Sequence, residues 1–230
     1  MKNLAVLTGA GISAESGIST FRDSNGLWEQ HNVMDVASID GWYKNPKLVL
    51  DFYNERRKQL ETVEPNAAHK ILYELEEYFN VCIITQNVDN LHERAGSTNI
   101  IHLHGELTKV RSIADEDTVY DIGYKPIHIG DTDSNGSQLR PHIVWFGEAV
   151  PLLNAAANNV SQADIVAIIG TSLNVYPAAG LVNYKKNSAP VFLINPHDVS
   201  AFHIQNLILI KAKATTGVAD MRNMLIEKFL

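Results

Sequence analysis

Short apolar runs alternate with longer amphipathic segments along most of the chain. The runs are continuous rather than interleaved with polar residues, which is typical of parallel strands buried on both faces. We expect strands at residues 4–8, 81–85, 100–104, 143–146, 165–170, 191–195 and 207–210. The pattern therefore predicts an α/β fold built on a doubly wound parallel sheet.

The segments between these runs carry the period of amphipathic helices. Residues 45–61 start with Asn45 as a helix N-cap and Pro46 in the first turn, and their apolar residues recur on one face. The same period predicts helices at 65–79, 177–186 and 218–230. A chain of 230 residues is long enough for one large domain, and we expect residues 1–230 to form it.

One segment interrupts this alternation. Residues 112–136 contain six acidic residues, one lysine and the turn-rich run GDTDSNGS, with few apolar residues. Such a composition predicts either a small inserted subdomain or a mobile loop. We place the inserted module at residues 108–141.

Composition narrows the class of protein. Hydrophobic residues make up 45% and charged residues 20% of the chain, which is typical of a soluble globular protein. No apolar run approaches the roughly 20 residues of a membrane span, and a formal net charge of -7 opposes general binding to nucleic acids. The first strand follows Met-Lys-Asn without the apolar core of a secretory signal, and the lone Cys82 cannot form an internal disulfide. We therefore expect a cytoplasmic protein with neither a membrane nor a nucleic acid as its partner.

Small or polar residues follow five of the predicted strands. In open α/β sheets, ligands bind beyond the carboxyl ends of the strands, so these endings predict one shared crevice. Turn chemistry alone also favours such residues, and for any single ending that alternative stays open. The endings are Gly9-Ala10-Gly11, Gln86-Asn87-Val88-Asp89, His104-Gly105, Gly170-Thr171-Ser172 and Asn195-Pro196.

The first of these endings fits a dinucleotide-binding pattern. Residues 9–14 read GAGISA and match G-x-G-x-x-G/A, in which backbone N–H groups and a helix N-terminus meet a pyrophosphate. In a dehydrogenase, a helix, a second strand and an acidic residue about 20 positions further on would follow. Here no apolar strand precedes Glu29. The sequence therefore predicts a bound dinucleotide but not the layout for hydride transfer.

Several longer blocks resemble one family. The sirtuins, which are NAD-dependent protein deacylases, carry similar blocks in the same order. The blocks are GAGISAESGISTFRDSNGLW (9–28), TQNVDNLHERAG (85–96), HLHGEL (102–107), PHIVWFGE (141–148), GTSLNVYPAAG (170–180) and INP (194–196). The resemblance implies a Rossmann-like sheet, a helical part of a small domain at about 28–64, and NAD that is consumed as a co-substrate. It also implies acetyl-, succinyl- or malonyl-lysine proteins as partners, with nicotinamide and O-acyl-ADP-ribose as products.

The resemblance assigns the catalytic roles to three residues. His104 matches the neutral imidazole that acts as general base on a ribose hydroxyl, and a histidine pKa of about 6.5 suits that task. Asn87 and Asp89 match residues that hold the nicotinamide carboxamide and the reacting ribose. Without its flanking HGEL block, His104 alone would be read as a structural histidine at a strand end.

The resemblance also implies a larger set of residues around NAD. Phe21 and Arg22 match a mobile loop over the nicotinamide, and an aromatic ring there would keep water from the reacting centre. Ser13, Thr171 and Ser172 offer hydroxyl groups to phosphate or ribose. The full predicted set is Gly9, Ala10, Gly11, Ile12, Ser13, Thr20, Phe21, Arg22, Trp28, Gln86, Asn87, Val88, Asp89, Gly170, Thr171, Ser172, Asn195, Pro196, His197 and Ala214.

A further pair of residues bears on the acyl group. Tyr53 and Arg56 are spaced i, i+3 and share a helix face, as in the class III sirtuins that remove succinyl and malonyl groups. A phenol and a guanidinium can hold a carboxylate at the end of an acyl chain, and Ala37 matches a small residue that widens the pocket. The alternative is a cation placed near a helix C-terminus by the dipole. The segment Val144, Trp145, Phe146, Gly147 and Glu148 resembles the strand that pairs with the substrate backbone.

The chain departs from the family at the structural zinc. Most sirtuins carry two Cys-x-x-Cys pairs between the HGEL and FGE blocks, and this chain has no cysteine there. Acidic residues and His128 in the segment could bind a cation, but structural zinc sites use mainly cysteine and histidine. We therefore predict no zinc. The module would rest on apolar contacts from Val119, Tyr120, Ile122, Tyr124 and Ile127.

Two other functions compete with deacylation. An NAD hydrolase or mono-ADP-ribosyltransferase would keep NAD cleavage, but it would have no use for Tyr53 and Arg56 as a carboxylate clamp. A non-catalytic NAD or ADP-ribose sensor would not need the general base His104.

Overall fold

The computed structural model describes residues 1–20, 32–201 and 203–229. Its larger part, here called the large lobe, is a six-stranded sheet in the order β3-β2-β1-β7-β8-β9, and every pairing is parallel. The prediction of a parallel α/β sheet is confirmed. The strands are β1 Lys2–Thr8, β2 Phe79–Thr85, β3 Ile100–His102, β7 Ile165–Ile169, β8 Val191–Ile194 and β9 Leu207–Ile210.

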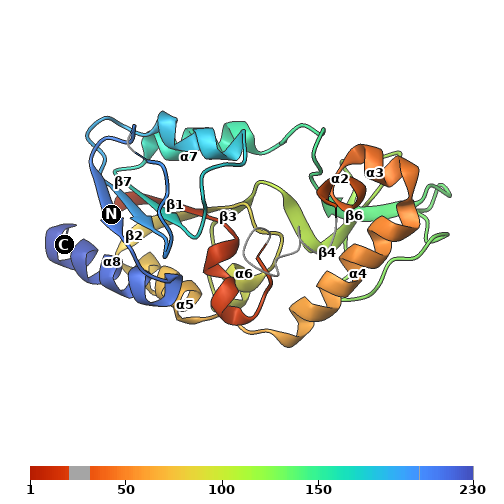
Figure 1. Cartoon of the computed structure of the whole chain (residues 1–230), viewed down its shortest axis with the longest axis horizontal. Helices are drawn as coiled ribbons and strands as arrows, with labels where there is room; N and C mark the ends of the chain where they lie inside the picture. Colours follow the sequence, from red (N-terminus) through yellow and green to blue (C-terminus); the bar gives the residue numbers. More distant parts are fainter. Residues whose placement is uncertain (21–31, 202, 230) are drawn as a thin grey trace.

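Both faces of this sheet are covered, which explains the continuous apolar runs. Helices α5 (Ala67–Glu74) and α8 (Ala214–Phe229) pack on one face, and α7 (Leu153–Gln162) and the 3-10 helix η4 (Ala178–Tyr184) pack on the other (Figure 1). Every residue of β7 is buried. A strand with an apolar layer on each side has no position left for an alternating polar residue.

The remaining elements form a second unit, here called the small lobe, on the right of Figure 1. Its antiparallel sheet has the order β5-β4-β6, with β4 Gly105–Ser112, β5 Val119–Asp121 and β6 Leu139–Ile143. Three helices share one apolar cluster with this sheet. They are α2 (Val33–Val36), α3 (Ile39–Lys44) and α4 (Pro46–Thr62). Asn45 caps α4 by accepting from the N–H of Leu48, as its place before Pro46 predicted.

The acidic segment, residues 112–136, is part of the small lobe and is held by a few apolar contacts and by bonds within its turns. Ile127 is buried in the lobe's core and Ile122 and Tyr124 pack against it, but Val119 and Tyr120 are exposed, so the expected contacts from these two were wrong. The carboxylates serve the turns, since Asp115, Asp131 and Asp133 each accept from nearby backbone N–H groups. These side-chain bonds satisfy backbone N–H groups that have no partner in a β-sheet.

Some element boundaries differ from the prediction. The expected strand at 143–146 is wrong, because β6 ends at Ile143. Beyond it, the N–H of Val144 donates to His104 O and the N–H of Phe146 donates to Ala37 O, so the chain changes partner instead of continuing a ladder. The expected helix at 177–186 is a 3-10 helix, and α8 begins at Ala214 rather than at Val218. Helix α7 and strand β4 were not predicted.

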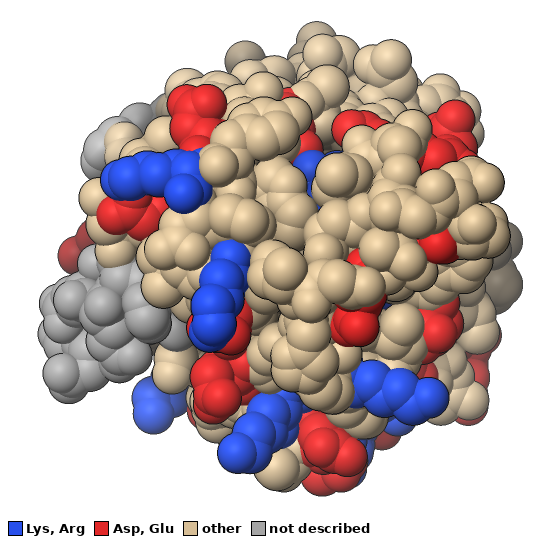
Figure 2. All heavy atoms as spheres, turned by 90° about the vertical axis from the view of Figure 1, so that its right-hand side faces the viewer, with Lys and Arg blue, Asp and Glu red and all other residues tan. Residues whose placement is uncertain are grey.

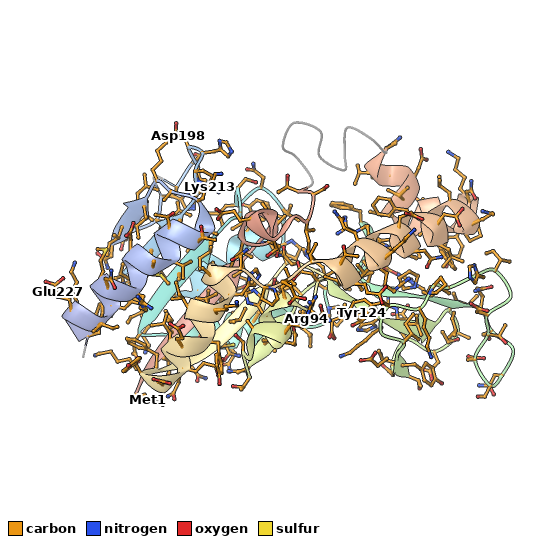
Figure 3. The ribbon with its side chains drawn as sticks, turned by 90° about the horizontal axis from the view of Figure 1, so that it is seen from below. Met1, Arg94, Tyr124, Asp198, Lys213 and Glu227 are labelled. Carbon is orange, nitrogen blue, oxygen red and sulfur yellow. The ribbon has the colours of Figure 1, made fainter. Side chains whose placement is uncertain are left out.

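Helix α6 (Leu91–Ala95) joins the two lobes (Figure 3). The guanidinium of Arg94 donates to Leu60 O and pairs with Glu64, while Asn90 donates to the hydroxyl of Tyr124. On the side of the molecule that carries the small lobe, cationic and anionic side chains intermingle without a basic patch (Figure 2). None of the helices in the described ranges has the length and apolar character needed to cross a membrane.

Candidate functional site

A cavity of about 640 Å³ lies where the carboxyl ends of the large-lobe strands meet the small lobe. This is where a doubly wound sheet places a ligand. Most of the residues singled out from the sequence line it. They are Gly9, Ala10, Gly11, Thr20, Ala37, Tyr53, Arg56, Gln86, Asn87, Val88, His104, Val144, Trp145, Phe146, Gly147, Glu148, Gly170, Thr171, Ser172, Asn195, Pro196, His197 and Ala214.

The cavity also has lining residues that the sequence did not single out. Val175, Tyr176 and Pro177 come from the GTSLNVYPAAG block, in which the sequence predicted contacts only for Gly170, Thr171 and Ser172. Glu15 is held in place because its carboxylate accepts from the N–H and the hydroxyl of Thr215, each at 2.9 Å. The others are Ala14, Phe52, Ile143, Val150, Asp198, Val199 and Lys213.

The glycine turn packs backbone against backbone. The N–H of Gly11 donates to Gly170 O at 2.9 Å, which ties the end of β1 to the end of β7. A Cβ on Gly11 would lie 2.7 Å from the Cα of Gly170, so no larger residue fits at that position. This close approach brings two strand ends to the same wall of the cavity.

The same turn differs from the phosphate-binding geometry that its pattern predicted. Among the residues described up to Thr20, only short 3-10 turns, at Ala10–Ile12 and Ala14–Ser16, follow β1, so no long helix begins directly at this turn. The N–H groups of Gly9, Gly11, Ile12 and Ser13 all donate to carbonyls of the chain. Binding of a ligand at this turn therefore has to rely mainly on side chains, because few backbone N–H groups are available to donate.

Behind the turn, three side chains form a buried hydrogen-bond chain. The amide of Asn87 donates to Gly9 O at 3.1 Å and to Ser13 Oγ at 3.2 Å, and Ser13 donates to Asp89 at 2.9 Å. Both N–H bonds of the Asn87 amide are thus used, and its Oδ1 is left to accept from a ligand. Burial raises the pKa of Asp89. Ser13 and Asp89 do not line the cavity, and Ile12 packs in the core of the large lobe.

His104 follows β3 in a turn that ends at Gly105, where a Cβ would lie 2.0 Å from His142 O. Its Nδ1 lies 3.0 Å from Gln86 O. Because a carbonyl oxygen only accepts, Nδ1 carries the hydrogen and Nε2 is the basic nitrogen of the neutral ring. Burial lowers the pKa of His104, opposed by this hydrogen bond. The imidazole is therefore neutral at pH 7 and able to take a proton at Nε2.

His102 lies two residues earlier but serves a different contact. Its Nε2 lies 2.6 Å from Glu93, and Glu106 pairs with Lys109 at 2.7 Å. Burial alone would lower the pKa of His102, but the bond to Glu93 raises it. Glu93, His102 and Glu106 are close enough to share an ion, and in the structure these groups are engaged in ion pairs.

Helix α4 contributes part of the cavity wall. Tyr53 and Arg56 both line it, as their spacing predicted, and Ala37 is buried beside them. Burial raises the pKa of Tyr53 to about 12, so the phenol stays protonated. Burial lowers the pKa of Arg56, opposed by Tyr53 and Asp89, and a guanidinium nonetheless keeps its charge at neutral pH. A protonated phenol and a desolvated cation favour a ligand that carries negative charge.

Three predicted residues and one common feature of the family have no counterpart among the described side chains. Phe21, Arg22 and Trp28 lie outside the described residues. The cysteine pairs of a structural zinc site are missing from the sequence itself, because its single cysteine, Cys82, lies in β2 of the large lobe. The small lobe thus does not fit a zinc ion held by four cysteines.

Comparison with known proteins gives close relatives along the whole chain. The model of the Sir2 family matches residues 9–177. A protein of Helicobacter pylori named NAD-dependent protein deacylase is 56% identical over 227 residues, covering 99% of each chain. A protein of the same name from Bacteroides thetaiotaomicron is 54% identical over 231 residues, covering 98% of this chain and 99% of the relative.

Solved structures agree with this assignment. An ADP-ribose complex of a Sir2 homologue variant superposes with a TM-score of 0.91 at 38% identity, covering 98% of this chain and 92% of that one. A complex of Sir2 with a p53 peptide and NAD+ superposes with a TM-score of 0.78 at 30% identity, covering 98% and 92%. The predicted resemblance is thus confirmed by sequence and by fold, and the chain belongs to the Sir2 family.

Proposed function

We propose that this protein is an NAD-dependent protein-lysine deacylase that removes acetyl, succinyl and malonyl groups. Its products are nicotinamide, free lysine and O-acyl-ADP-ribose. The observation that carries the proposal is one continuous cavity. It is lined by the glycine turn and Asn87, by the neutral His104, and by Tyr53 and Arg56.

The NAD end of the cavity fits the co-substrate in its donors and acceptors. Asn87 Oδ1 accepts from a carboxamide N–H of the nicotinamide, while the Ser13–Asp89 pair holds the Asn87 side chain in that orientation. Hydroxyl groups from Thr171 and Ser172 face the cavity for ribose or phosphate. Relatives that bind ADP-ribose or NAD+ support this placement. NAD supplies the chemistry by losing nicotinamide from its ribose.

His104 moves the proton. With Nδ1–H held by Gln86 O, the free Nε2 takes the proton of a ribose hydroxyl, which makes that oxygen a nucleophile toward the acyl carbon. Burial keeps the ring neutral before this step, so the base is ready at physiological pH. A fixed tautomer costs no reorganisation when the reaction begins.

Tyr53, Arg56 and Ala37 select the acyl group. The guanidinium can bind a terminal carboxylate in a bidentate manner, the phenol can donate to it, and the small side chain of Ala37 leaves room for a longer acyl chain. An acetyl group is smaller and still fits, but it offers no carboxylate to these residues.

The protein substrate enters along residues 144–148. A peptide–NAD+ complex of a Sir2 relative supports recognition of a peptide next to the dinucleotide. In this proposal, the peptide backbone adds a strand beside the segment. The ring of Phe146 is 46% exposed, so it offers an apolar contact to a side chain of that peptide.

Two alternative functions would leave some of the cavity residues without a role. NAD hydrolysis or mono-ADP-ribosyl transfer would have no use for the cation of Arg56 and the phenol of Tyr53 on the cavity wall. A sensor of NAD or ADP-ribose would not require His104 to be neutral with a fixed tautomer. We further propose a cytoplasmic location with protein rather than nucleic acid as partner, in keeping with a net charge of -7 and a lone buried cysteine.

The test is mass spectrometry of acetyl- and succinyl-lysine peptides incubated with NAD and the purified protein. We expect loss of the acyl group with stoichiometric O-acyl-ADP-ribose, and a loss of activity of about a hundredfold or more in His104→Ala, on the order of a removed general base. His128→Ala, which changes an exposed histidine of the small lobe, is the matched control. NAD consumption without deacylation would favour the hydrolase or transferase, and binding of intact NAD alone would favour the sensor.

A further inference from the structure

We propose that Trp145 is a positioning residue for Tyr53: its indole N–H holds the Tyr53 hydroxyl so that the hydroxyl donates into the cavity and selects acyl chains that end in a carboxylate. The inference rests on the proposed deacylase function and adds to it a residue outside the Tyr53–Arg56 pair that determines specificity. It begins from one contact, in which Trp145 Nε1 donates to Tyr53 Oη at 3.0 Å.

The direction of this hydrogen bond decides what Tyr53 can do. An indole N–H is only a donor, so the Tyr53 oxygen must accept from it. The hydroxyl hydrogen must then point away from Trp145, and within the described ranges the structure gives it no acceptor. Tyr53 lines the cavity, so the acceptor is left for a ligand to supply.

The indole is itself held firmly. The guanidinium carbon of Arg140 lies 3.5 Å from the centroid of the Trp145 ring, and the ring of Trp42 lies 5.4 Å away at a tilt of 31°. Trp145 is 2% exposed. A cation over one part of the ring and an aromatic neighbour beside it leave little freedom for the N–H to turn.

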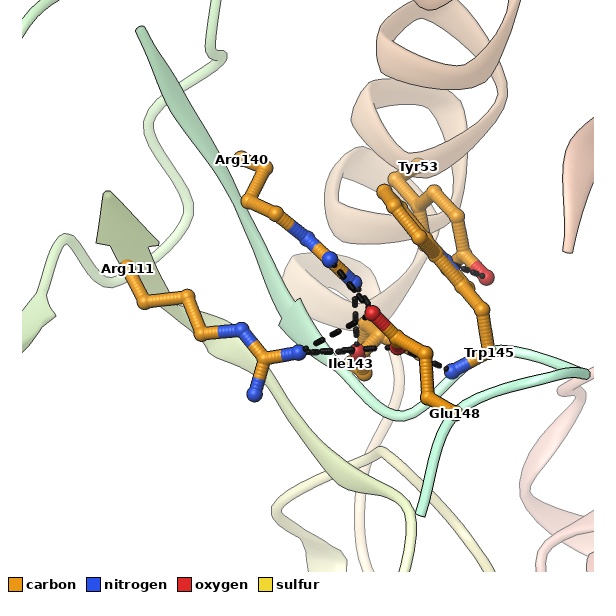
Figure 4. Close-up of polar contacts among 6 residues, drawn as sticks. All are labelled: Tyr53, Arg111, Arg140, Ile143, Trp145 and Glu148. Carbon is orange, nitrogen blue, oxygen red and sulfur yellow. Dashed lines mark hydrogen bonds and ion pairs between the residues drawn. The ribbon is translucent and has the colours of Figure 1, made fainter. Parts of the chain in front are cut away.

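Arg140 is fixed in turn by Glu148 (Figure 4). The two terminal nitrogens of the Arg140 guanidinium, Nη1 and Nη2, lie 2.6 and 3.0 Å from the two oxygens of Glu148. Nη2 also donates to Ile143 O at 3.0 Å. Glu148 also accepts from the backbone N–H of Trp145 at 2.8 Å. Arg111 of β4 approaches the same carboxylate at 3.5 Å. A chain of charged and polar contacts thus runs from the small sheet to the Tyr53 hydroxyl.

The consequence is a donor that is oriented before the substrate binds. A carboxylate ligand gains a hydrogen bond from Tyr53 in addition to the charge of Arg56, without the entropic cost of orienting the phenol. An acetyl group ends in a methyl group and gains nothing from this donor. Loss of the Trp145 N–H should therefore lower kcat/KM for succinyl-lysine peptides more than for acetyl-lysine peptides.

The test is a double-mutant cycle on the ratio of kcat/KM for succinyl- and acetyl-lysine peptides. Trp145→Phe keeps an aromatic ring and removes the N–H, and Tyr53→Phe removes the hydroxyl. We expect each to lower the succinyl-to-acetyl ratio by about three- to tenfold, as for one hydrogen bond, and the double variant to lower it no further than the larger single effect. A change in packing alone would lower kcat/KM for both peptides and leave their ratio unchanged, because the acetyl group does not use the Tyr53 donor.

Trp42→Phe is the matched control, because it removes a neighbouring buried indole that does not contact Tyr53 through a hydrogen bond. We expect its ratio to stay within about twofold of the wild type. If Trp145→Phe does not fold, the benzothiophene analogue of tryptophan at position 145 removes the N–H and keeps the shape. An unchanged ratio in the Trp145 variant, or effects that multiply in the double variant, would overturn the inference. A wild-type protein that deacylates neither peptide would instead overturn the proposed function.

Discussion

The two lobes are stabilised by different kinds of interaction. In the large lobe, strands such as β7 are buried at every residue, and two apolar clusters cover the faces of the sheet. The small lobe has one apolar cluster, and beside it Arg57, Arg111 and Arg140 are all buried. The large-lobe wall of the cavity is thus supported by apolar packing, whereas the small-lobe wall is supported by an apolar cluster together with buried charged groups.

This difference matters because the small lobe lacks the cysteines that hold zinc in most sirtuins. Arg111 and Arg140 come from neighbouring strands and meet at Glu148, which links β4 and β6 to the segment of residues 144–148. Arg57 adds a link from α4 to β4 by donating to Leu107 O at 2.7 Å. Charged contacts of this kind are directional, so they fix the lobe's geometry as well as its stability.

The largest expected effects come from one buried substitution in each lobe. Glu148→Gln leaves two buried cations without their carboxylate and should cost about 3–5 kcal/mol of unfolding free energy. Phe192→Ala in the large lobe should cost a similar amount, about 3–5 kcal/mol, through a cavity. Urea unfolding measures both losses, and native-state amide hydrogen exchange assigns each loss to its lobe, because protection should fall first in the lobe that carries the substitution.

The control for this comparison is Glu116→Gln, since Glu116 is an exposed carboxylate of the small lobe. We expect it to change stability by less than about 0.5 kcal/mol. A Glu148→Gln protein that is as stable as the wild type would show that apolar contacts alone hold the small lobe.

A smaller effect concerns pH and the large lobe. His69 and His92 are fully buried with ring centroids 4.9 Å apart, and burial lowers the pKa of His69 to about 4. Between pH 4 and about 6.5 the unfolded chain binds more protons than the folded one, so stability falls as pH falls through this range. We expect urea unfolding at pH 5 to give a lower free energy than at pH 7.5, by on the order of 1–3 kcal/mol.

His69→Gln checks the source of this pH dependence, because it removes the titrating group and keeps a polar side chain. The variant should show a smaller difference between the two pH values than the wild type. If the difference is unchanged, the loss of stability arises elsewhere. Glu148 would be a candidate only at lower pH, since its pKa is lowered by its bond to Arg140 despite burial, and its contribution is lost as pH falls through that lowered value.

The parts of the molecule that were predictable from the sequence are those set by local pattern. Continuous apolar runs locate the parallel strands, and the i, i+3 spacing of Tyr53 and Arg56 places both on the cavity. The glycine pattern at residues 9–14 located the turn but not its geometry, because the N–H groups of Gly9 and Gly11 bond to a strand end that arrives much later in the chain.

The charged framework of the small lobe could not be predicted in this way. Arg111 and Glu148 are 37 positions apart, and Arg57 and Leu107 are 50 apart. Arginines in a sequence are normally exposed, so nothing local signals that these are buried. The end of β6 at Ile143 was missed for the same reason, since its following residues bond to His104 and Ala37.

The most direct test of the account is Arg56→Met, measured for two properties in the same preparation. One is the ratio of kcat/KM for succinyl- and acetyl-lysine peptides, and the other is the affinity for ADP-ribose. Lys58→Met, an exposed cation of the same helix, is the control. The account predicts that Arg56→Met lowers the ratio by about ten- to hundredfold, as for a lost charged hydrogen bond, with ADP-ribose affinity within about twofold of the wild type. A preserved ratio, or a loss of ADP-ribose binding, would contradict the division of the cavity between the two lobes.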